Sequence, residues 1–138
     1  MSYLLDTNVL SELRKGRRCA PSVLRWAKSA EHELHTSVIV LGELKRGVER
    51  VRPKDPRFAA ELERWLTRLM TAMAARILPV DQAIALEWGR ISVPRTVPPI
   101  DGLLAATALV RGMTLVTRNV KDFADLGVSW LNPFGTSH

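Results

Sequence analysis

The chain has 138 residues, which suits one domain spanning residues 1–138, and a formal net charge of +6 from 20 Lys and Arg against 14 Asp and Glu. Cys19 is the only cysteine, which excludes an internal disulfide. No apolar run is long enough to cross a membrane, and the N-terminus lacks a signal-peptide pattern. Together these features predict a cytoplasmic protein without membrane association. The basic excess favours a polyanionic partner and a merely solubilising surface about equally.

Hydrophobic periodicity and caps predict alternating strands and helices. In chain order they predict strand 4–5, helix 9–15, helix 21–30, strand 34–36, helix 38–52, helix 56–73, strand 77–80, helix 82–91, loop 93–99, helix 101–111, strand 114–117, polar loop 118–122 and strand 128–131. Ser37, Asp55 and Asp81 are good N-caps, while Gly16 and Gly112 end helices. This alternation predicts an α/β fold with a mainly parallel sheet covered on both faces.

Asp6 stands at the end of the first predicted strand, followed by Thr7 and Asn8 and then by a helix. In open α/β sheets, ligand sites lie at the carboxyl ends of the strands. The plain alternative is that Asp6 only caps the helix that follows. The choice between the two depends on whether other acids converge on Asp6.

Glu43 is a candidate partner in the helix over 38–52. Gly42 and Gly47 flank it, and each costs roughly 1 kcal/mol of helix stability relative to alanine. Such a cost is tolerated where something must approach the backbone closely. The alternative is a surface Glu43 paired with Lys45 or Arg46.

Asp101 follows a proline-rich loop and precedes Gly102. The small residues of its helix would let that helix pack tightly beside the first strand and bring Asp101 near Asp6. The alternative is again a helix cap. Asn119 and Asp122 follow the strand over 114–117, where turn chemistry alone would explain them.

Each of these alternatives is credible for one residue, but the strand-end acids should all lie at one edge of a parallel sheet. Clustered carboxylates repel and raise one another's pKa unless a cation lies among them. Oxygen ligands without His or Cys suit Mg²⁺ or Mn²⁺. An acidic pocket in a basic protein also suits a nucleic acid, because Arg and Lys hold its backbone while the metal acts on one phosphate.

Five segments in this order and spacing resemble the PIN-domain family, and within it the VapC/FitB-type ribonuclease toxins of bacterial toxin–antitoxin pairs. The likeness runs from residue 4 to residue 134. The segments are residues 4–12 (LLDTNVLSE), Ser37 with Glu43 and Gly47, residues 101–108 (DGLLAATA), residues 117–123 (TRNVKDF) and residues 132–134 (NPF). The resemblance implies a three-layer α/β/α sandwich with a mainly parallel central sheet.

The resemblance also assigns roles to site residues. Asp6, Glu43 and Asp101 would form an acidic triad that binds Mg²⁺ or Mn²⁺. Thr7 and Asn8 would support Asp6, and Thr117 would line the site.

The chain departs from the family at one position of the site, because the family often has an aspartate where this chain has Asn119. An amide still offers an oxygen ligand but removes a charge. Asp122 could supply the missing carboxylate, so the fourth catalytic position stays open between Asn119 and Asp122. The departure bears on metal affinity more than on the fold.

By the same resemblance, the protein would be a homodimer that is blocked by a VapB-type antitoxin and acts on RNA, either transfer or messenger RNA. The expected reaction is metal-dependent hydrolysis of an RNA phosphodiester bond by water, leaving 5′-phosphate and 3′-hydroxyl ends. An alternative is a PIN-fold module that binds RNA or a protein but cuts poorly, because Asn119 weakens the metal site. A phosphatase or receiver-like domain is disfavoured, since no second acid lies two residues after Asp6.

Overall fold

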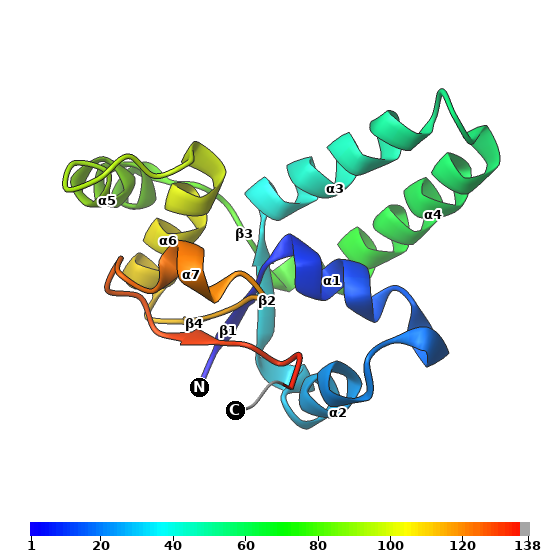
Figure 1. Cartoon of the computed structure of the whole chain (residues 1–138), viewed down its shortest axis with the longest axis horizontal. Helices are drawn as coiled ribbons and strands as arrows, with labels where there is room; N and C mark the ends of the chain where they lie inside the picture. Colours follow the sequence, from blue (N-terminus) through cyan, green and yellow to red (C-terminus); the bar gives the residue numbers. More distant parts are fainter. Residues whose placement is uncertain (136–138) are drawn as a thin grey trace.

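The computed structural model describes residues 1–135 and contains a five-stranded sheet, in the order β3-β2-β1-β4-β5, in which every pairing is parallel (Figure 1). The strands are β1 (Tyr3–Leu5), β2 (Leu34–Ser37), β3 (Ile77–Leu78), β4 (Thr114–Val116) and β5 (Trp130–Leu131). The predicted α/β class and parallel sheet are therefore confirmed. Residues 136–138 of the expected domain lie outside the described residues.

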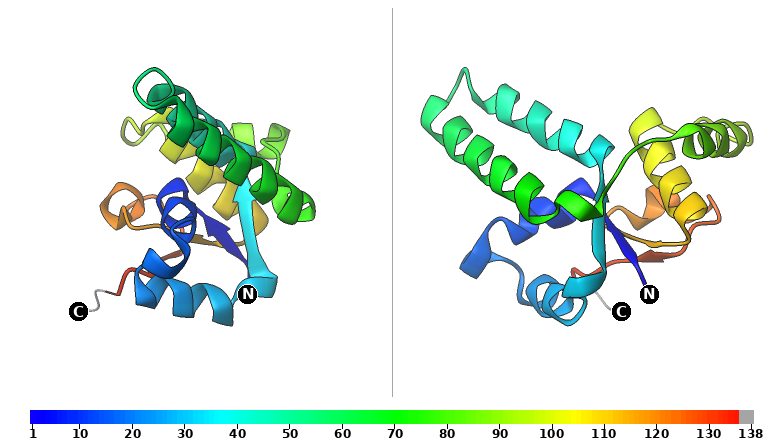
Figure 2. Two further views of the ribbon diagram at one scale, coloured as in Figure 1. Left: turned by 90° about the vertical axis from the view of Figure 1, so that its right-hand side faces the viewer. Right: turned by 180° about the vertical axis from the view of Figure 1, so that it is seen from behind.

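Seven α-helices surround this sheet in the described part of the chain. They are α1 (Thr7–Leu13), α2 (Pro21–Ser29), α3 (Val38–Val51), α4 (Pro56–Ala72), α5 (Gln82–Ile91), α6 (Pro99–Arg111) and α7 (Val120–Phe123). Figures 1 and 2 show the α3–α4 and α5–α6 pairs on one side of the sheet and α2 on the other, so that the sheet is the middle layer. None of the helices in residues 1–135 has the length and apolar character that a membrane crossing needs.

Local hydrogen bonds explain where the helices begin and end. Ser37, Asp55 and Asp81 each accept a hydrogen bond from a backbone N–H two or three residues further on, as predicted. Gly112 ends α6 in the left-handed conformation, with φ of 65°, which costs glycine little. These caps fix the helix starts and ends that carry the site.

Two predicted boundaries around the site are wrong. Helix α6 begins at Pro99, inside the predicted loop, and its N-cap is Pro98; Asp101 therefore lies in the first turn and is not a cap. A proline at this position needs no backbone hydrogen bond, which lets the helix begin earlier. The predicted polar loop over residues 118–122 is in part the short helix α7, which follows Asn119.

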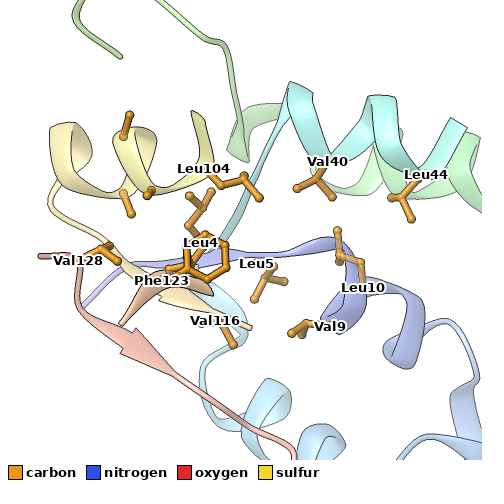
Figure 3. Packing of buried hydrophobic residues seen from close by; sticks show 14 of the residues in the cluster. Leu4, Leu5, Val9, Leu10, Val40, Leu44, Leu104, Val116, Phe123 and Val128 are labelled. Atoms are coloured by element: carbon orange, nitrogen blue, oxygen red, sulfur yellow. The ribbon is translucent and has the colours of Figure 1, made fainter. Parts of the chain in front are cut away.

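The core is built around β1 and covers both faces of the sheet. Leu4 and Leu5 of β1 are buried together with Leu104 of α6, Val40 of α3 and Phe123 of α7 (Figure 3). Burial of a large apolar side chain contributes roughly 1.5–3 kcal/mol, so each of these residues anchors its element firmly. Phe123 fixes α7 to the sheet, and Asp122 is its immediate neighbour in sequence.

The order of the strands defines where a ligand can bind. The chain runs from β1 outward to β2 and β3 and then returns to β4 on the other side of β1. The carboxyl ends of β1 and β4 thus flank the point at which the strand order reverses, the usual ligand position in such sheets. Asp6 follows β1 directly, and Thr117 follows β4 directly.

Gly102, one of the small residues of α6, packs against α5. A Cβ added at Gly102 would lie 2.7 Å from Cδ1 and 2.9 Å from Nε1 of Trp88. A Cβ at Gly89, in contrast, would meet no atom within 4 Å. The glycine next to Asp101 is therefore required by the close approach of α5.

We expect Gly102→Ala to lower the free energy of unfolding by about 1–3 kcal/mol, because the added methyl group overlaps a rigid indole ring. The matched variant Gly89→Ala should raise it by up to about 1 kcal/mol, since alanine favours a helix. Urea denaturation of the two variants measures both changes. Equal effects in the two variants would contradict the assigned packing.

Candidate active site

The Asp6 carboxylate is held by three donors at the carboxyl end of β1. Its Oδ1 accepts the backbone N–H of Thr7 at 2.7 Å, so Asp6 also caps α1. Its Oδ2 accepts the hydroxyl of Thr117 at 2.8 Å and the amide of Asn8 at 3.4 Å. Only 6% of Asp6 is exposed. Asp6 is thus both the N-cap of α1 and a buried residue of the site.

Thr117 joins the loop after β4 to the turn after β1. Its hydroxyl donates to Asp6, and its oxygen accepts from the Asn8 amide at 3.4 Å and from the backbone N–H of Asn119 at 3.0 Å. The side-chain Oδ1 of Asn8 accepts a hydrogen bond from the backbone N–H of Arg118 at 3.1 Å. The geometry of Asp6 therefore depends on both strand ends.

Glu43 reaches the same region from α3. Its Oε1 accepts the hydroxyl of Thr7 at 2.5 Å. The pairing with Lys45 considered as an alternative is not observed, because Lys45 pairs with Glu49 at 3.0 Å and with Glu63 at 2.6 Å.

No other segment of residues 1–135 makes the close approach to the backbone that would explain the two glycines beside Glu43. A Cβ at Gly42 or Gly47 would meet no atom of residues 1–135 within 4 Å. No neighbouring segment of that range therefore requires either glycine.

Two carboxyl groups at this edge of the sheet, those of Asp101 and Asp6, have raised pKa values. The pKa of Asp101 is raised to about 6, first by burial and then by the negative charges of Asp122, Asp6 and Glu43. Burial likewise raises the pKa of Asp6, against the hydrogen bonds that it accepts, and Glu43 and Asp122 raise it further. The positive charge of Arg95 acts on Asp101 in the opposite direction. The structure thus brings Asp6, Glu43, Asp101 and Asp122 within electrostatic reach of one another.

Asn119 and Asp122 differ in how they meet the site. The backbone N–H of Asn119 donates to Thr117, and its carbonyl accepts from the N–H of Asp122 at 3.1 Å. The side chain of Asn119 makes no capping hydrogen bond to α7. The negative charge of Asp122, in contrast, acts on both Asp6 and Asp101. Of the two residues, Asp122 is the one that adds charge to the cluster.

The donor chemistry of this cluster fits a hard divalent cation. In residues 1–135, no three His, Cys, Asp or Glu side chains stand close enough together to hold a metal ion as they are placed. The four carboxylates nevertheless offer only oxygen donors, which suits Mg²⁺ or Mn²⁺. A cation among them would oppose the repulsion that, in addition to burial, raises the pKa of Asp6 and Asp101. The charge of the cluster, rather than a preformed cage, therefore supports metal binding.

Arg95 is a site residue that sequence reasoning missed. Its guanidinium donates to both carboxylate oxygens of Asp125, at 2.8 and 2.7 Å, and to the carbonyl of Asp122 at 3.1 Å. It thereby ties the loop that leads into α6, the helix of Asp101, to the segment around α7 that carries Asp122. The sequence gives no local signal for this contact, because the partners lie 27 and 30 residues apart.

An apolar groove opens beside the acids. It has a volume of about 290 Å³ and lies between α1, α3 and α4. Thr7 and Glu43 line its end at the acidic cluster. Its other lining residues are Ser11, Arg14, Leu44, Gly47, Val48, Val51, Phe58, Leu62 and Trp65. The groove thus offers an apolar surface that is continuous with the cluster.

Comparison with known proteins gives consistent matches. A family model described as PIN domain matches residues 3–128. The chain is 30% identical over 137 residues to the VapC ribonuclease Y4jK of Sinorhizobium fredii. This match covers 95% of this chain and 96% of that protein. It is 32% identical over 139 residues to the toxin FitB of Neisseria gonorrhoeae, with 95% and 97% covered. The solved structure of FitAB bound to an IR36 DNA fragment matches with a TM-score of 0.85 and 28% identity, over 99% of this chain and 98% of that chain.

The raised pKa of Asp101 predicts how the stability of the metal-free protein depends on pH. A carboxyl group whose folded pKa of about 6 exceeds its ordinary value of 3.8 binds its proton more tightly in the folded state. The tighter proton binding stabilises the folded state. This stabilisation is fully present below the ordinary pKa and is lost as the pH rises through about 6.

In EDTA, the melting temperature should therefore fall more steeply between about pH 4 and pH 7 in the unaltered protein than in Asp101→Asn, which imitates the protonated acid. Differential scanning fluorimetry measures both profiles, and Glu31→Gln serves as an exposed control. Identical slopes in Asp101→Asn and the unaltered protein would contradict the shift.

Proposed function

The chain belongs to the PIN domain family, and we propose that it is a divalent-metal-dependent endoribonuclease, the toxin of a VapBC-type toxin–antitoxin pair. The observation that carries this proposal is the convergence of Asp6, Glu43, Asp101 and Asp122 at the point where the strand order reverses. The names of two relatives, VapC ribonuclease and toxin FitB, support it. The location in this proposal is the cytoplasm.

In this proposal Asp6, Glu43, Asp101 and Asp122 hold Mg²⁺ or Mn²⁺, and Asp122 rather than Asn119 supplies the fourth carboxylate. When bound, the cation neutralises charge on the phosphate and acidifies water. Attack by water, rather than by the RNA 2′-hydroxyl, leaves 5′-phosphate and 3′-hydroxyl ends.

The surrounding residues orient these ligands. Thr117 and the N–H of Thr7 hold the two oxygens of Asp6 in fixed directions, and the hydroxyl of Thr7 holds Glu43. Asn8 fixes the relation between the two strand ends. Thr7, Asn8 and Thr117 are therefore supporting residues, which keep the carboxylates together against their repulsion.

The alternative function is a module that binds RNA or a protein and cuts poorly. Two observations favour it: Asn119 stands where the family often has an acid, and no metal-ready group of side chains is present in residues 1–135. Added Mn²⁺ discriminates between the two functions. A filled site raises the melting temperature by linkage, whereas a pure binding module shows no shift.

The partner we propose is a VapB-type antitoxin that docks in the apolar groove between α1, α3 and α4. The position of the groove supports this role. Thr7 and Glu43 line the end of the groove at the acidic cluster, so a bound segment would cover the acids. Several solved relatives are complexes of a toxin with an antitoxin, some of them bound to DNA. A homodimer with RNA as substrate completes the proposal.

Asp6→Asn, Glu43→Gln and Asp101→Asn should each reduce RNA cleavage by at least about 100-fold, because each removes a proposed metal ligand. Gel analysis of total bacterial RNA incubated with Mg²⁺ or Mn²⁺ measures the loss, and circular dichroism confirms folding. Glu61→Gln, an exposed acid on α4, is the control and should cut normally. Retention of cleavage in EDTA by all three variants would overturn the site assignment.

Leu62→Lys should abolish binding of the antitoxin without reducing RNA cleavage, because it places a charge in the apolar groove but leaves the acids intact. The probe is the product of a short reading frame next to this gene, co-expressed and measured by co-purification. Leu86→Lys, at an exposed position of α5 outside the groove, is the control. Equal co-purification with both variants would show that the antitoxin docks elsewhere.

A further inference from the structure

Arg118 directly follows the site residue Thr117, and its side chain carries a cation held in a defined position. The carbon of its guanidinium lies 3.8 Å from the centroid of the Phe134 ring. Its backbone N–H donates to Asn8, the residue whose amide also donates to Asp6. More than half of the side chain, 56%, is exposed. The guanidinium is therefore held against a ring while part of it remains open to solvent.

The anion nearest to Arg118 is largely committed to other groups. Glu12 lies 4.0 Å from the Arg118 guanidinium, but the same oxygen pairs with Lys15 at 3.0 Å. The second Glu12 oxygen accepts the backbone N–H of Ala20 at 2.8 Å, and only 8% of the Glu12 side chain is exposed. One buried carboxylate thus serves two cations, and a positive surplus remains between them.

The loop after α1 adds two exposed arginines close to Lys15 in the chain. Lys15 is followed by a turn of 3₁₀-helix over Gly16–Arg18, which exposes Arg17 and Arg18. We call Lys15, Arg17, Arg18 and Arg118 the basic rim. A phosphate chain crossing the acidic cluster needs such cations nearby, since the carboxylates alone would repel it.

We propose that Arg118 binds a backbone phosphate of the RNA next to the bond that is cut, with Lys15 as the second cation of the basic rim. A guanidinium forms two parallel hydrogen bonds to phosphate oxygens, and stacking on Phe134 orients it before the RNA arrives. Asn8 holds the backbone of Arg118 next to Asp6, and the Phe134 ring holds the guanidinium at the end of the same side chain. This inference rests on the proposed ribonuclease function.

The test measures binding of a fluorescent single-stranded RNA of mixed sequence by anisotropy, in the cleavage-deficient Asp101→Asn background. We expect Arg118→Ala to weaken binding about tenfold and to reduce the salt dependence by about one phosphate contact between about 50 and 200 mM salt. Arg118→Lys should keep the salt dependence, because the charge remains, but lose part of the affinity. Phe134→Leu should lose affinity with an unchanged salt dependence.

Arg90→Ala, which removes an exposed arginine of α5, is the matched control and should bind as before. If the unaltered protein cuts RNA but Arg118→Ala keeps its affinity and salt dependence, this inference is overturned and the proposed function stands. If Arg118→Ala loses only its binding to the product of the neighbouring reading frame, Arg118 contacts protein and the inference is again overturned. If the unaltered protein neither binds nor cuts RNA, the proposed function fails as well.

Discussion

Repulsion among carboxylates at one end of a parallel sheet is the constraint on which the rest of this structure depends. Asp6, Glu43, Asp101 and Asp122 come from four segments, and each is held in its own way. Asp6 and Glu43 each accept a hydrogen bond from Thr7 after β1, and Asp6 also accepts one from Thr117 after β4. Asp101 lies in the first turn of α6, where the helix dipole favours a negative charge. Asp122 is held through Phe123, which is fully buried. The sheet and its core thus keep together charges that would separate in solution.

The fold was largely predictable because its determinants are local. Periodic apolar residues, capping side chains and terminal glycines define most helices, and the alternation of strands and helices implies a parallel sheet. The misplaced elements lie where local signals conflict. Prolines suggested a loop before Asp101, although Pro99 fits the first turn of a helix. Residues 118–122 are polar, yet Phe123, just beyond them, gives α7 its anchor in the core.

The candidate site was predictable only in part, because its members are joined across the fold. Asp6 could be identified from its place after an apolar strand, and the small residues of the helix that carries Asp101 predicted that this acid lies near Asp6. The sequence leaves the fourth position open between Asn119 and Asp122, since both suit a turn. Arg95 and the stacking of Arg118 on Phe134 depend on contacts between distant segments. The spacing of residues along the chain does not predict such contacts.

Asn8 touches both halves of the proposed site, and this has a thermodynamic consequence. Its amide nitrogen contacts the Asp6 carboxylate, and its amide oxygen holds the backbone of Arg118. If a ligand of the acids shifts Asn8, the energetic effect extends to Arg118, and by reciprocity a ligand of Arg118 alters affinity at the acids by the same factor. One neutral side chain can therefore make the occupancy of the two subsites cooperative.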